Sequence, residues 1–444
     1  MATVISALDM KSVHAWTGTV YVNADGSVSP SDAPVIRSDD LYTMTGDVSS
    51  DVDGVVILRS NMTLDGAGHL VQGPGGGGSN GMYVESKSNL TIRNVRVEAF
   101  DYGIFLNKSS SVNASENSVI NNIKGGFSLY ESSNIMLFKN NIATNWDGIE
   151  MIMSNNNTIR ENYIEANVHY GIGLCSSENN RVYHNSFVSN IYQQVSSCAG
   201  LTNVWCDNYP SCGNYWSDYS GVDVQGGVYQ NETGGDGIGD TWYVIDENNS
   251  DRYPLMGSWT DTGEDVSVTR PSGVSFLFSK VLSGGVTIIN ESGVGPTLPL
   301  GFRHASKPPV YYYVKTTANY TGLVSVGMTY DGHGLTQLEK SLMNLVRWNY
   351  TSQRWENITT RTEISRNTIY GETANLSMFT LSIPLLGDIN SDGTVDIFDA
   401  ITLASAFGSK PGYTNWYPKA DINNDGVVDI YDAIILANNY GTPT

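Results

Sequence analysis

The chain has 444 residues, of which 40% are hydrophobic and 16% charged, and its formal net charge is −21. One hydrophobic core rarely serves this length, so we expect several domains. The low charge fraction, with 26 Tyr and 46 Gly, disfavours a helix-rich cytosolic enzyme and favours a β-rich extracellular protein. The acidic balance argues against a nucleic-acid partner, and no apolar run is long enough for a membrane span.

We expect residues 1–50 to form an N-terminal segment and a cap. A repeat follows, in which glycines spaced 23, 22 and 23 residues apart each precede an apolar residue. Two apolar columns and one asparagine column keep the same period. The four columns are Gly103, Gly126, Gly148 and Gly171; Ile92, Ala114, Leu137, Ile159 and Val182; Val97, Val119, Ile142, Ile164 and Phe187; and Asn117, Asn140, Asn162 and Asn185.

Three apolar positions per period indicate three short strands per turn, because the segments are brief, β-branched and separated by Asn, Ser and Gly. A helical repeat would show a period of about 3.6 residues, which is missing. The pattern therefore predicts a parallel β-solenoid in which each coil stacks on the previous one. The asparagine column is then an amide ladder at an inward-facing bend.

The phrases NNTIRENYIEANVHYGIGL (156–174) and NNRVYHNSFVSN (179–190) resemble the right-handed parallel β-helix repeats of microbial surface proteins. These repeats belong to the carbohydrate-binding/sugar-hydrolysis family and to the β-helix family named for a periplasmic copper-binding protein. The resemblance implies a right-handed β-helix over 51–216 and a closing segment over 217–256, which looks like that of archaeal members. It specifies the fold better than the function. The sequence contains no cluster of soft ligands, such as His or Met, that would suit copper.

Four clustered cysteines favour disulfides in an oxidising compartment, with three possible pairings; a zinc site is the alternative. Cys175 and Cys198 are 23 residues apart, which is one coil. We therefore predict the bonds Cys175–Cys198 and Cys206–Cys212.

One column on the β-helix is expected to point outward, two residues before each glycine: Asp101, Lys124, Trp146, His169 and Tyr192. Glu150 is expected on the same face. Trp146 and Tyr192 could form a sugar-binding strip, and Asp101, Glu150 and His169 are the candidate catalytic residues. A solvated face, a sugar-binding face and a catalytic face all fit this pattern, and a non-catalytic role is the leading interpretation.

The closing segment holds oxygen-bearing side chains at short spacing around glycine, which is a pattern that suits Ca²⁺. A simple cluster of turns is the alternative interpretation. The residues of this candidate third calcium site are Asp236, Asp240, Asp246, Asn248 and Asp251.

The polar segment 257–273 is predicted to be a linker. Residues 274–386 alternate strand-like runs with turns every 10–15 residues, which predicts an antiparallel β-sandwich. Within it, residues 337–345 are expected to form a single helical turn.

The C-terminal segment 387–444 holds a duplicated calcium loop, since DINSDGTVDIFDAITLASAFG (388–408) recurs 33 residues later as DINNDGVVDIYDAIILANNYG (421–441). Oxygen ligands at positions 1, 3, 5, 9 and 12, with a backbone carbonyl at 7, would wrap one Ca²⁺ in each loop. The predicted ligands are Asp388, Asn390, Asp392, Thr394, Asp396 and Asp399, and then Asp421, Asn423, Asp425, Val427, Asp429 and Asp432.

This duplication, with Asp at position 12 and no helix before the loop, resembles a type I dockerin. The resemblance implies two bound Ca²⁺ and a cohesin-like or other protein partner. The pairs Ile397–Phe398 and Ile430–Tyr431 match the positions around which dockerins contact partners, and packing between the repeats is their alternative role.

Together the segments predict a secreted cell-surface protein that docks through calcium and presents its β-helix to polysaccharide. A β-helix polysaccharide lyase or glycoside hydrolase is one alternative. A self-assembling subunit of an extracellular filament or sheath is the other.

Overall fold

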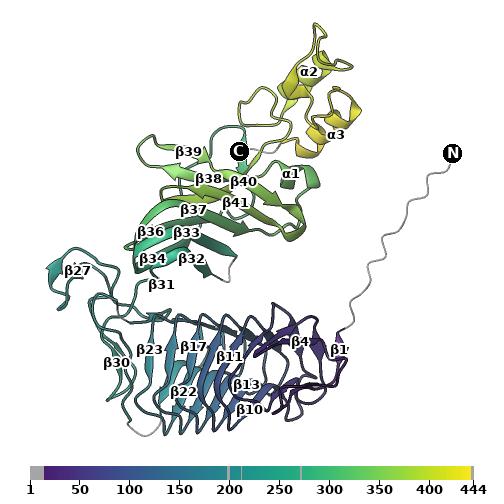
Figure 1. Cartoon of the computed structure of the whole chain (residues 1–444). Helices are drawn as coiled ribbons and strands as arrows, with labels where there is room; N and C mark the ends of the chain where they lie inside the picture. Colours follow the sequence, from purple (N-terminus) through teal and green to yellow (C-terminus); the bar gives the residue numbers. More distant parts are fainter. Residues whose placement is uncertain (1–14, 198–200, 212, 271–272, 442–444) are drawn as a thin grey trace. The chain divides into compact units, whose positions relative to one another are not determined.

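The computed structural model describes residues 15–197, 201–211, 213–270 and 273–441. The chain divides into two compact units, Met1–Trp259 and Thr260–Thr444, and each is described by itself (Figure 1). The first unit is a parallel β-solenoid, and the second holds antiparallel sheets followed by short helices.

Three sheets, named here A, B and C, form the walls of the solenoid. Sheet A consists of β1 (Trp16–Thr17), β6 (Val48–Ser49), β9 (Leu70–Gln72), β12 (Arg96–Glu98), β15 (Ser118–Ile120), β18 (Asn141–Ala143), β21 (Tyr163–Glu165), β24 (Ser186–Val188) and β26 (Tyr215–Trp216). Sheet B consists of β3 (Val28–Ser29), β2 (Val20–Val22), β7 (Val55–Ile57), β10 (Asn80–Glu85), β13 (Tyr102–Asn107), β16 (Gly125–Tyr130), β19 (Asp147–Ile152), β22 (Tyr170–Cys175) and β25 (Gln193–Ser197).

Sheet C consists of β4 (Val35–Ser38), β5 (Leu41–Met44), β8 (Met62–Asp65), β11 (Ser88–Arg93), β14 (Ser110–Ser115), β17 (Met136–Phe138), β20 (Thr158–Arg160) and β23 (Arg181–Tyr183). Two antiparallel pairs follow in the closing segment: β27 (Gln225–Gly226) with β28 (Glu232–Thr233), and β29 (Tyr243–Val244) with β30 (Ser250–Asp251).

The coil register predicted from the repeat is confirmed. Along sheet C, Ala114 pairs with Ile92 and Leu137, and Ile159 pairs with Leu137 and Val182. The corresponding residues of sheets A and B stack in the same way and fill one continuous apolar core. The parallel solenoid is therefore established, whereas its right-handedness stays a prediction.

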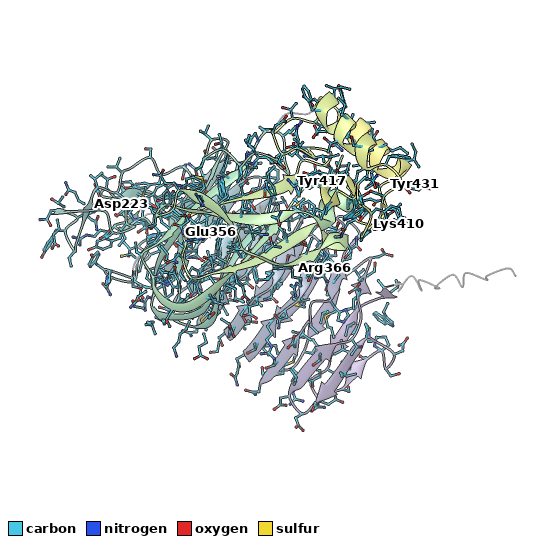
Figure 2. The ribbon with its side chains drawn as sticks, turned by 90° about the horizontal axis from the view of Figure 1, so that it is seen from above. Asp223, Glu356, Arg366, Lys410, Tyr417 and Tyr431 are labelled. Atoms are coloured by element: carbon cyan, nitrogen blue, oxygen red, sulfur yellow. The ribbon has the colours of Figure 1, made fainter. Side chains whose placement is uncertain are left out.

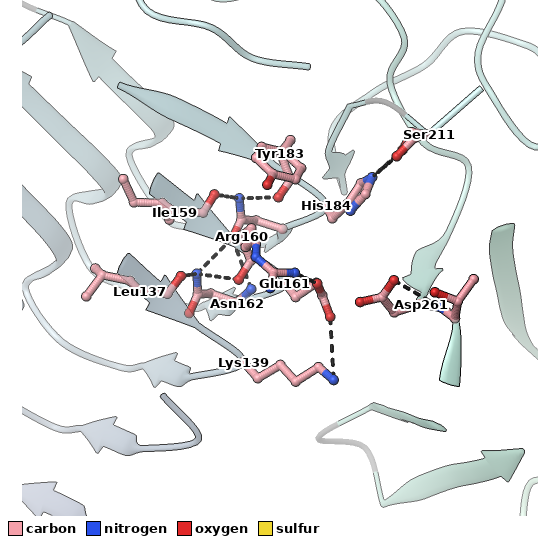
Figure 3. Close-up of polar contacts among 12 residues, drawn as sticks. Leu137, Lys139, Ile159, Arg160, Glu161, Asn162, Tyr183, His184, Ser211 and Asp261 are labelled. Carbon is pink, nitrogen blue, oxygen red and sulfur yellow. Dashed lines mark hydrogen bonds and ion pairs between the residues drawn. The ribbon is translucent and has the colours of Figure 1, made fainter. Parts of the chain in front are cut away.

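Asparagine ladders run through the bends of this core. Asn162 is typical, because its Nδ2 donates to Leu137 O at 2.8 Å and to Asn185 Oδ1 at 2.9 Å (Figure 3). Its own Oδ1 accepts from the backbone N–H and the Nδ2 of Asn140, at 3.0 and 2.9 Å. Each buried amide thus satisfies backbone groups that the strands leave unpaired at the bend. The predicted column of Asn117, Asn140, Asn162 and Asn185 is confirmed, and Asn122, Asn145, Asn167 and Asn190, and Asn157, Asn180 and Asn203, form two further ladders.

The first ladder ends on a carboxylate. Asn214 continues it, and the backbone N–H of Asn214 donates to Asp251 Oδ2 at 2.7 Å. Trp216 Nε1 donates to the same oxygen at 2.9 Å, and Tyr253 N–H donates to Oδ1. Burial raises the pKa of Asp251 to about 7, against the lowering effect of these three donors.

The second unit contains two antiparallel sheets that share one core, whose members include Phe276 from one sheet and Phe379 from the other. One sheet runs β34 (Gly285–Ser292), β36 (Tyr311–Thr316), β42 (Met378–Pro384), β38 (Asn344–Asn349) and β39 (Arg354–Asn357), with β35 (Phe302–His304) paired to β42. The other runs β32 (Gly263–Arg270), β33 (Val274–Ser283), β37 (Asn319–Thr329), β41 (Thr368–Thr373) and β40 (Thr359–Glu363).

The predicted linker 257–273 is wrong, because it contains β31 (Ser258–Thr260) and β32. In β32, Val266 and Val268 alternate with polar residues and are buried in the core, so a polar composition concealed a half-buried strand. The predicted helical turn is present as α1 (Gln337–Ser341), and a short 3-10 turn, Ile364–Arg366, precedes β41.

The C-terminal module, residues 387–441, has two loop–helix repeats. Asp396 caps α2 (Ile397–Ala406) and Asp429 caps α3 (Ile430–Asn439), each with a reciprocal bond from the helix N3 position. A 3-10 turn, Pro418–Ala420, lies between them. The small core includes Val395, Val428, Leu403 and Leu436, which are equivalent positions of the two repeats.

We expect Asn162→Ala to lower the free energy of unfolding of the β-helix by about 2–4 kcal/mol, because it leaves the buried donors of Asn140 without an acceptor. Chemical denaturation measures this change. The matched control is Asn113→Ala on β14, a half-buried residue whose side-chain oxygen has no hydrogen-bond partner among the described residues. An equal loss in both variants would contradict the ladder's role.

The stability of the β-helix should depend on Asp251. Its folded pKa of about 7 exceeds the ordinary 3.8, so its contribution is complete below about pH 4 and is lost as the pH rises to about 7. The difference between these two pKa values corresponds to at most ~4 kcal/mol in the free energy of unfolding. Denaturation midpoints at pH 5 and pH 8 should differ for the native chain and for the exposed control Asp51→Asn, but much less for Asp251→Asn. Equal pH dependence in all three proteins would refute the assignment.

Candidate polysaccharide-binding face

The outward surface of sheet B brings together residues from successive coils. In one row Tyr102, Gly125 and Asp147 are paired neighbours, and Tyr170 N–H donates to the Asp147 carboxylate. In the next row Phe105, Ser128, Glu150 and Gly173 are paired neighbours. Adjacent strands lie roughly 4.8 Å apart, so each coil offers a new contact at regular intervals along the solenoid. A linear polymer lying along the axis could meet one coil after another.

An aspartate–histidine pair lies on this surface, where Asp147 begins β19 and His169 directly precedes β22. His169 Nδ1 lies 3.1 Å from Asp147 Oδ1, and the same oxygen accepts the backbone N–H of Tyr170 at 3.1 Å. The His169 ring is surrounded by Tyr170, Tyr192 and Trp146, with ring centroids at 3.6, 5.3 and 5.6 Å. Burial raises the pKa of Asp147, although the N–H of Tyr170 and His169 oppose this shift.

Glu150 lies on β19 three residues beyond Asp147 and, as predicted, on the outward face. Ser128 Oγ donates to Glu150 Oε2 at 3.2 Å. Burial raises the pKa of the Glu150 carboxyl, and the charge of Asp147 adds to the shift. Burial also raises the pKa of Tyr102, and the negative charge of Glu150 adds to this shift. Glu150 thus favours its protonated form more than an ordinary glutamate does.

The predicted sugar strip is exposed, since 49% of Trp146 and 66% of Tyr192 are accessible. His169 lies between them, as the column predicted. Sequence reasoning missed Asp147, Tyr170 and Tyr102, which stand one residue before each glycine, next to the column that was chosen. Reading that neighbouring column would have found them.

Asp101 is wrong as an outward catalytic candidate, because only 5% of it is exposed. Its carboxylate pairs with Lys124 Nζ at 2.7 Å and accepts the backbone N–H of Gly78 at 3.1 Å. It therefore joins the turn before β10 to the next coils. Lys124 in turn lies 5.7 Å above the ring of Tyr102.

Two glycines on this face lie under tyrosine rings. A Cβ at Gly125 would meet the Tyr102 ring at 3.2 Å, and one at Gly173 would meet the Tyr170 ring at 3.5 Å. The absence of side chains at these two positions allows the rings to lie close to the sheet on either side of Glu150. The strands of sheet B contain no Lys or Arg.

In the two predicted calcium loops, backbone N–H groups converge on the carboxylates at the first and last positions. In the first, Asp388 accepts the N–H groups of Asp392 and Gly393 at 3.0 Å each, and Asp399 accepts those of Ile389, Asn390 and Asp396. The second loop repeats these bonds around Asp421 and Asp432.

These loops fit Ca²⁺. Asp399 and Asp432 are fully buried, and burial raises the pKa of Asp388, to which the charge of Asp399 contributes. Carboxylates buried this close together need a cation, and hard oxygen ligands suit calcium. The predicted residues of both loops would hold it.

The first turns of both helices are apolar and exposed. Ile397 and Phe398 are 53% and 62% accessible, and Ile430 and Tyr431 are 56% and 62% accessible (Tyr431 is marked in Figure 2). They lie outside the core between the repeats, so the alternative packing role is not supported. Ile401 and Ile434, one turn further on, extend the exposed surface and were missed.

The predicted third calcium site has no support in the contacts of its residues. Asp251 ends the first asparagine ladder. Asn249 Oδ1 accepts the backbone N–H of Asn203, the last residue of the third ladder, and Asn249 Nδ2 donates to Asp246, which ends that ladder. Asp236 and Asp240 instead accept backbone N–H groups of Gly227 and Val224, and Asn248 N–H donates to Asp246. Hydrogen bonding within the cap accounts for this cluster of oxygen atoms.

The disulfide predictions stay predictions, because Cys198 and Cys212 lie outside the described residues. Cys175 is exposed at the end of β22, and Cys206 is half-buried. The register pairs Leu174 with Ser197, the residues that directly precede Cys175 and Cys198 in the chain.

Two parts of the chain match known family models. Residues 28–221 match the family described as periplasmic copper-binding protein (NosD), and residues 386–440 match the type I dockerin domain. The chain carries a NosD-type parallel β-helix and a C-terminal type I dockerin domain. Calcium binding is a general property of type I dockerin domains, which agrees with the oxygen-lined loops. In the described part of the chain, no helix is long and apolar enough to cross a membrane.

Several solved structures are similar to parts of the chain. The periplasmic alginate epimerase AlgG is 16% identical over 36% of this chain and 50% of its own, with a TM-score of 0.23. Tailspike protein 2 of bacteriophage CBA120 is 11% identical over 82% and 66%, with a TM-score of 0.30. This chain spans about half the length of the epimerase. No curated protein matches the chain. At these scores the likenesses carry no functional argument.

We expect calcium to control the folding of the dockerin domain. Removing Ca²⁺ with EDTA should abolish hydrogen-exchange protection of α2 and α3, because clustered carboxylates then repel across a small core. Peptides of the β-helix, measured in the same sample, should be unchanged. Asp392→Asn combined with Asp425→Asn keeps the side-chain shape in each loop but should require more Ca²⁺ for protection. Identical protection in EDTA and in Ca²⁺ would refute this.

Proposed function

We propose that this protein is a secreted cell-surface protein that docks through its dockerin domain and binds polysaccharide along the outward face of sheet B. The observation that carries the proposal is the cluster of Trp146, His169, Tyr170 and Tyr192 beside the carboxyls of Asp147 and Glu150. Aromatic faces stack on the apolar faces of sugar rings, and carboxyls accept bonds from sugar hydroxyls. Because the coils are evenly spaced, a linear polymer lying along the solenoid could contact side chains from several coils.

The charges on this face favour a neutral polysaccharide over an acidic one. No strand of sheet B contributes a basic side chain, and Lys124, beside the face, is paired with Asp101. The whole chain also carries a net charge of −21. A polymer of uronates would meet repulsion from Asp147 and Glu150 with little compensation.

The remaining parts suit presentation of this face at a surface. The two-sheet domain is proposed to be a β-sandwich spacer. The exposed apolar residues Ile397, Phe398, Ile430 and Tyr431 are proposed to contact a cohesin-type partner once calcium has folded the loops.

Affinity electrophoresis of the full chain in gels that contain xylan, galactomannan, mixed-linkage β-glucan or arabinan tests the proposal. At least one neutral polymer should retard the protein, while polygalacturonate should not. Trp146→Ala combined with Tyr192→Ala should weaken binding about 10-fold or more, because each lost stacking contact costs roughly 1 kcal/mol.

Tyr229→Ala is the matched control, since Tyr229 is 77% exposed but lies between β27 and β28, away from sheet B. It should bind as the native chain does. Retardation by none of the neutral polymers, or equal weakening in both variants, would overturn the proposed function.

A further inference from the structure

We propose that the outward face of sheet B binds an extended β-1,4-linked chain of neutral pyranoses, with one sugar on each coil and with Tyr102 and Tyr170 as stacking positions three coils apart. This inference rests on the proposed function, because it specifies the glycan that the same face would bind. It adds the linkage of that glycan, the shortest chain that reaches both stacking positions, and a second group of aromatic side chains.

The second aromatic group lies nearer the N-terminal end of the same face. The ring centroid of Phe105 on β13 lies 5.7 Å from that of Tyr83 on β10 and 5.4 Å from that of Tyr102. All three side chains are half-buried, so their rings belong neither to the core nor fully to the solvent. The face therefore carries two groups of rings, one on β10 and β13 and the other around His169.

One tyrosine of each group lies in the same row of the sheet. Tyr102 begins β13 and Tyr170 begins β22, both of which are labelled in Figure 1, and β16 and β19 lie between these strands. Tyr102 pairs with Gly125, Gly125 pairs with Asp147, and the Asp147 carboxylate accepts the N–H of Tyr170. Tyr102 and Tyr170 are thus three strand spacings apart, or about 14 Å along the solenoid.

The two coils between these tyrosines contribute small and acidic side chains. Gly125 and Asp147 occupy the row itself, and Ser128 and Glu150 occupy the next row. Ser128 Oγ donates to Glu150 Oε2 at 3.2 Å. None of these four positions holds an aromatic or long aliphatic side chain that would lift a sugar off the tyrosine rings. The carboxyl oxygens accept hydrogen bonds from sugar hydroxyls instead.

Both tyrosine rings lie close to the sheet. Gly125 and Gly173 carry no side chain at the points where the rings of Tyr102 and Tyr170 approach the backbone. Lys124 Nζ, which is paired with Asp101, lies 5.7 Å from the centroid of the Tyr102 ring. This ammonium group would be a hydrogen-bond donor beside a sugar that stacks on that ring.

The spacing of the coils selects the glycan by its linkage. In a β-1,4 chain of glucose, mannose or xylose, both bonds to each ring are equatorial, so the chain is extended. Each sugar then advances the chain by close to the strand spacing of roughly 4.8 Å, and successive sugars meet successive coils. An α-1,4 chain of glucose has one axial bond per ring, so it coils and loses this match. A β-1,4 chain therefore keeps stacking contacts with both tyrosines.

The shortest chain that reaches both rings has four sugars. The first sugar stacks on Tyr102 and the fourth on Tyr170, while the second and third lie over Gly125 and Asp147. A chain of three sugars reaches only one of the two rings. The second stacking contact raises the affinity, because it forms within a complex that has already lost its translational freedom.

Isothermal titration calorimetry of the full chain, in Ca²⁺ and with oligosaccharides of two to six sugars, tests this inference. In at least one β-1,4 series of glucose, mannose or xylose, the affinity should rise about 5-fold or more between three and four sugars, because one more stacking contact forms. Malto-oligosaccharides differ from the β-1,4 glucose series only in the configuration of the linkage. They should show no such rise.

Tyr102→Ala and Tyr170→Ala should each abolish the rise. Each should leave the affinity for three sugars within about 2-fold, because the other ring still binds a short chain. Tyr102→Phe keeps the ring and should keep the rise. The matched control, Tyr183→Ala, removes a half-buried tyrosine from sheet C and should also keep it.

Three results would overturn this inference and leave the proposed function intact. These are binding of a neutral polymer without a rise in any β-1,4 series, an equal rise in the malto-oligosaccharides, and a rise that survives both alanine substitutions. Retardation by arabinan alone would count as the first of these results, because arabinan contains no β-1,4 bond. Failure to bind any of the four neutral polymers would overturn both.

Discussion

The fold of the first unit depends on the buried side-chain amide that joins one coil to the next. In each ladder the asparagine donates to the oxygen of the following coil and accepts from the previous one. These amides form hydrogen bonds with backbone N–H and C=O groups at the bends, where no neighbouring strand can pair with them. The chain can therefore turn inward without leaving buried polar groups unpaired. The apolar columns fill the interior but would tolerate a slip, whereas the ladder fixes the register of one coil on the next.

Because the register of the coils is fixed, residues that recur with the period of the repeat form a continuous surface. Residues 22–23 positions apart become neighbours, so Trp146, His169 and Tyr192 gather although one coil separates each from the next. The same register brings Asp147 beside His169 and Ser128 beside Glu150. This face is therefore built from side chains on or next to the strands of sheet B, and the glycines at 125 and 173 let the rings of Tyr102 and Tyr170 lie close to the sheet.

The repeat made much of this predictable. The columns, the asparagine ladder, both calcium loops and the outward position of Glu150 follow from spacing alone. Asp101 could not be placed in this way, because its burial depends on Lys124 and on a glycine-rich turn outside the repeat. The strand β32 was hidden by polar residues on its exposed face. Asp246 and Asp251 resembled calcium ligands because a carboxylate that ends an amide ladder is also an oxygen-rich group in a turn.

The ladders also have a direction. Each asparagine in the first ladder directs its backbone N–H and one Nδ2–H towards the C-terminal end of the solenoid, where Asn214 meets the carboxylate of Asp251. The aligned dipoles place partial positive charge at that end, as at a helix N-terminus, so an acidic side chain is the matching terminator. Each interior coil, by contrast, presents the same acceptors on one side and the same donors on the other. Whole coils can therefore be duplicated or deleted between the two caps without leaving an unpaired amide, and the length of the outward face of sheet B can change in evolution one coil at a time.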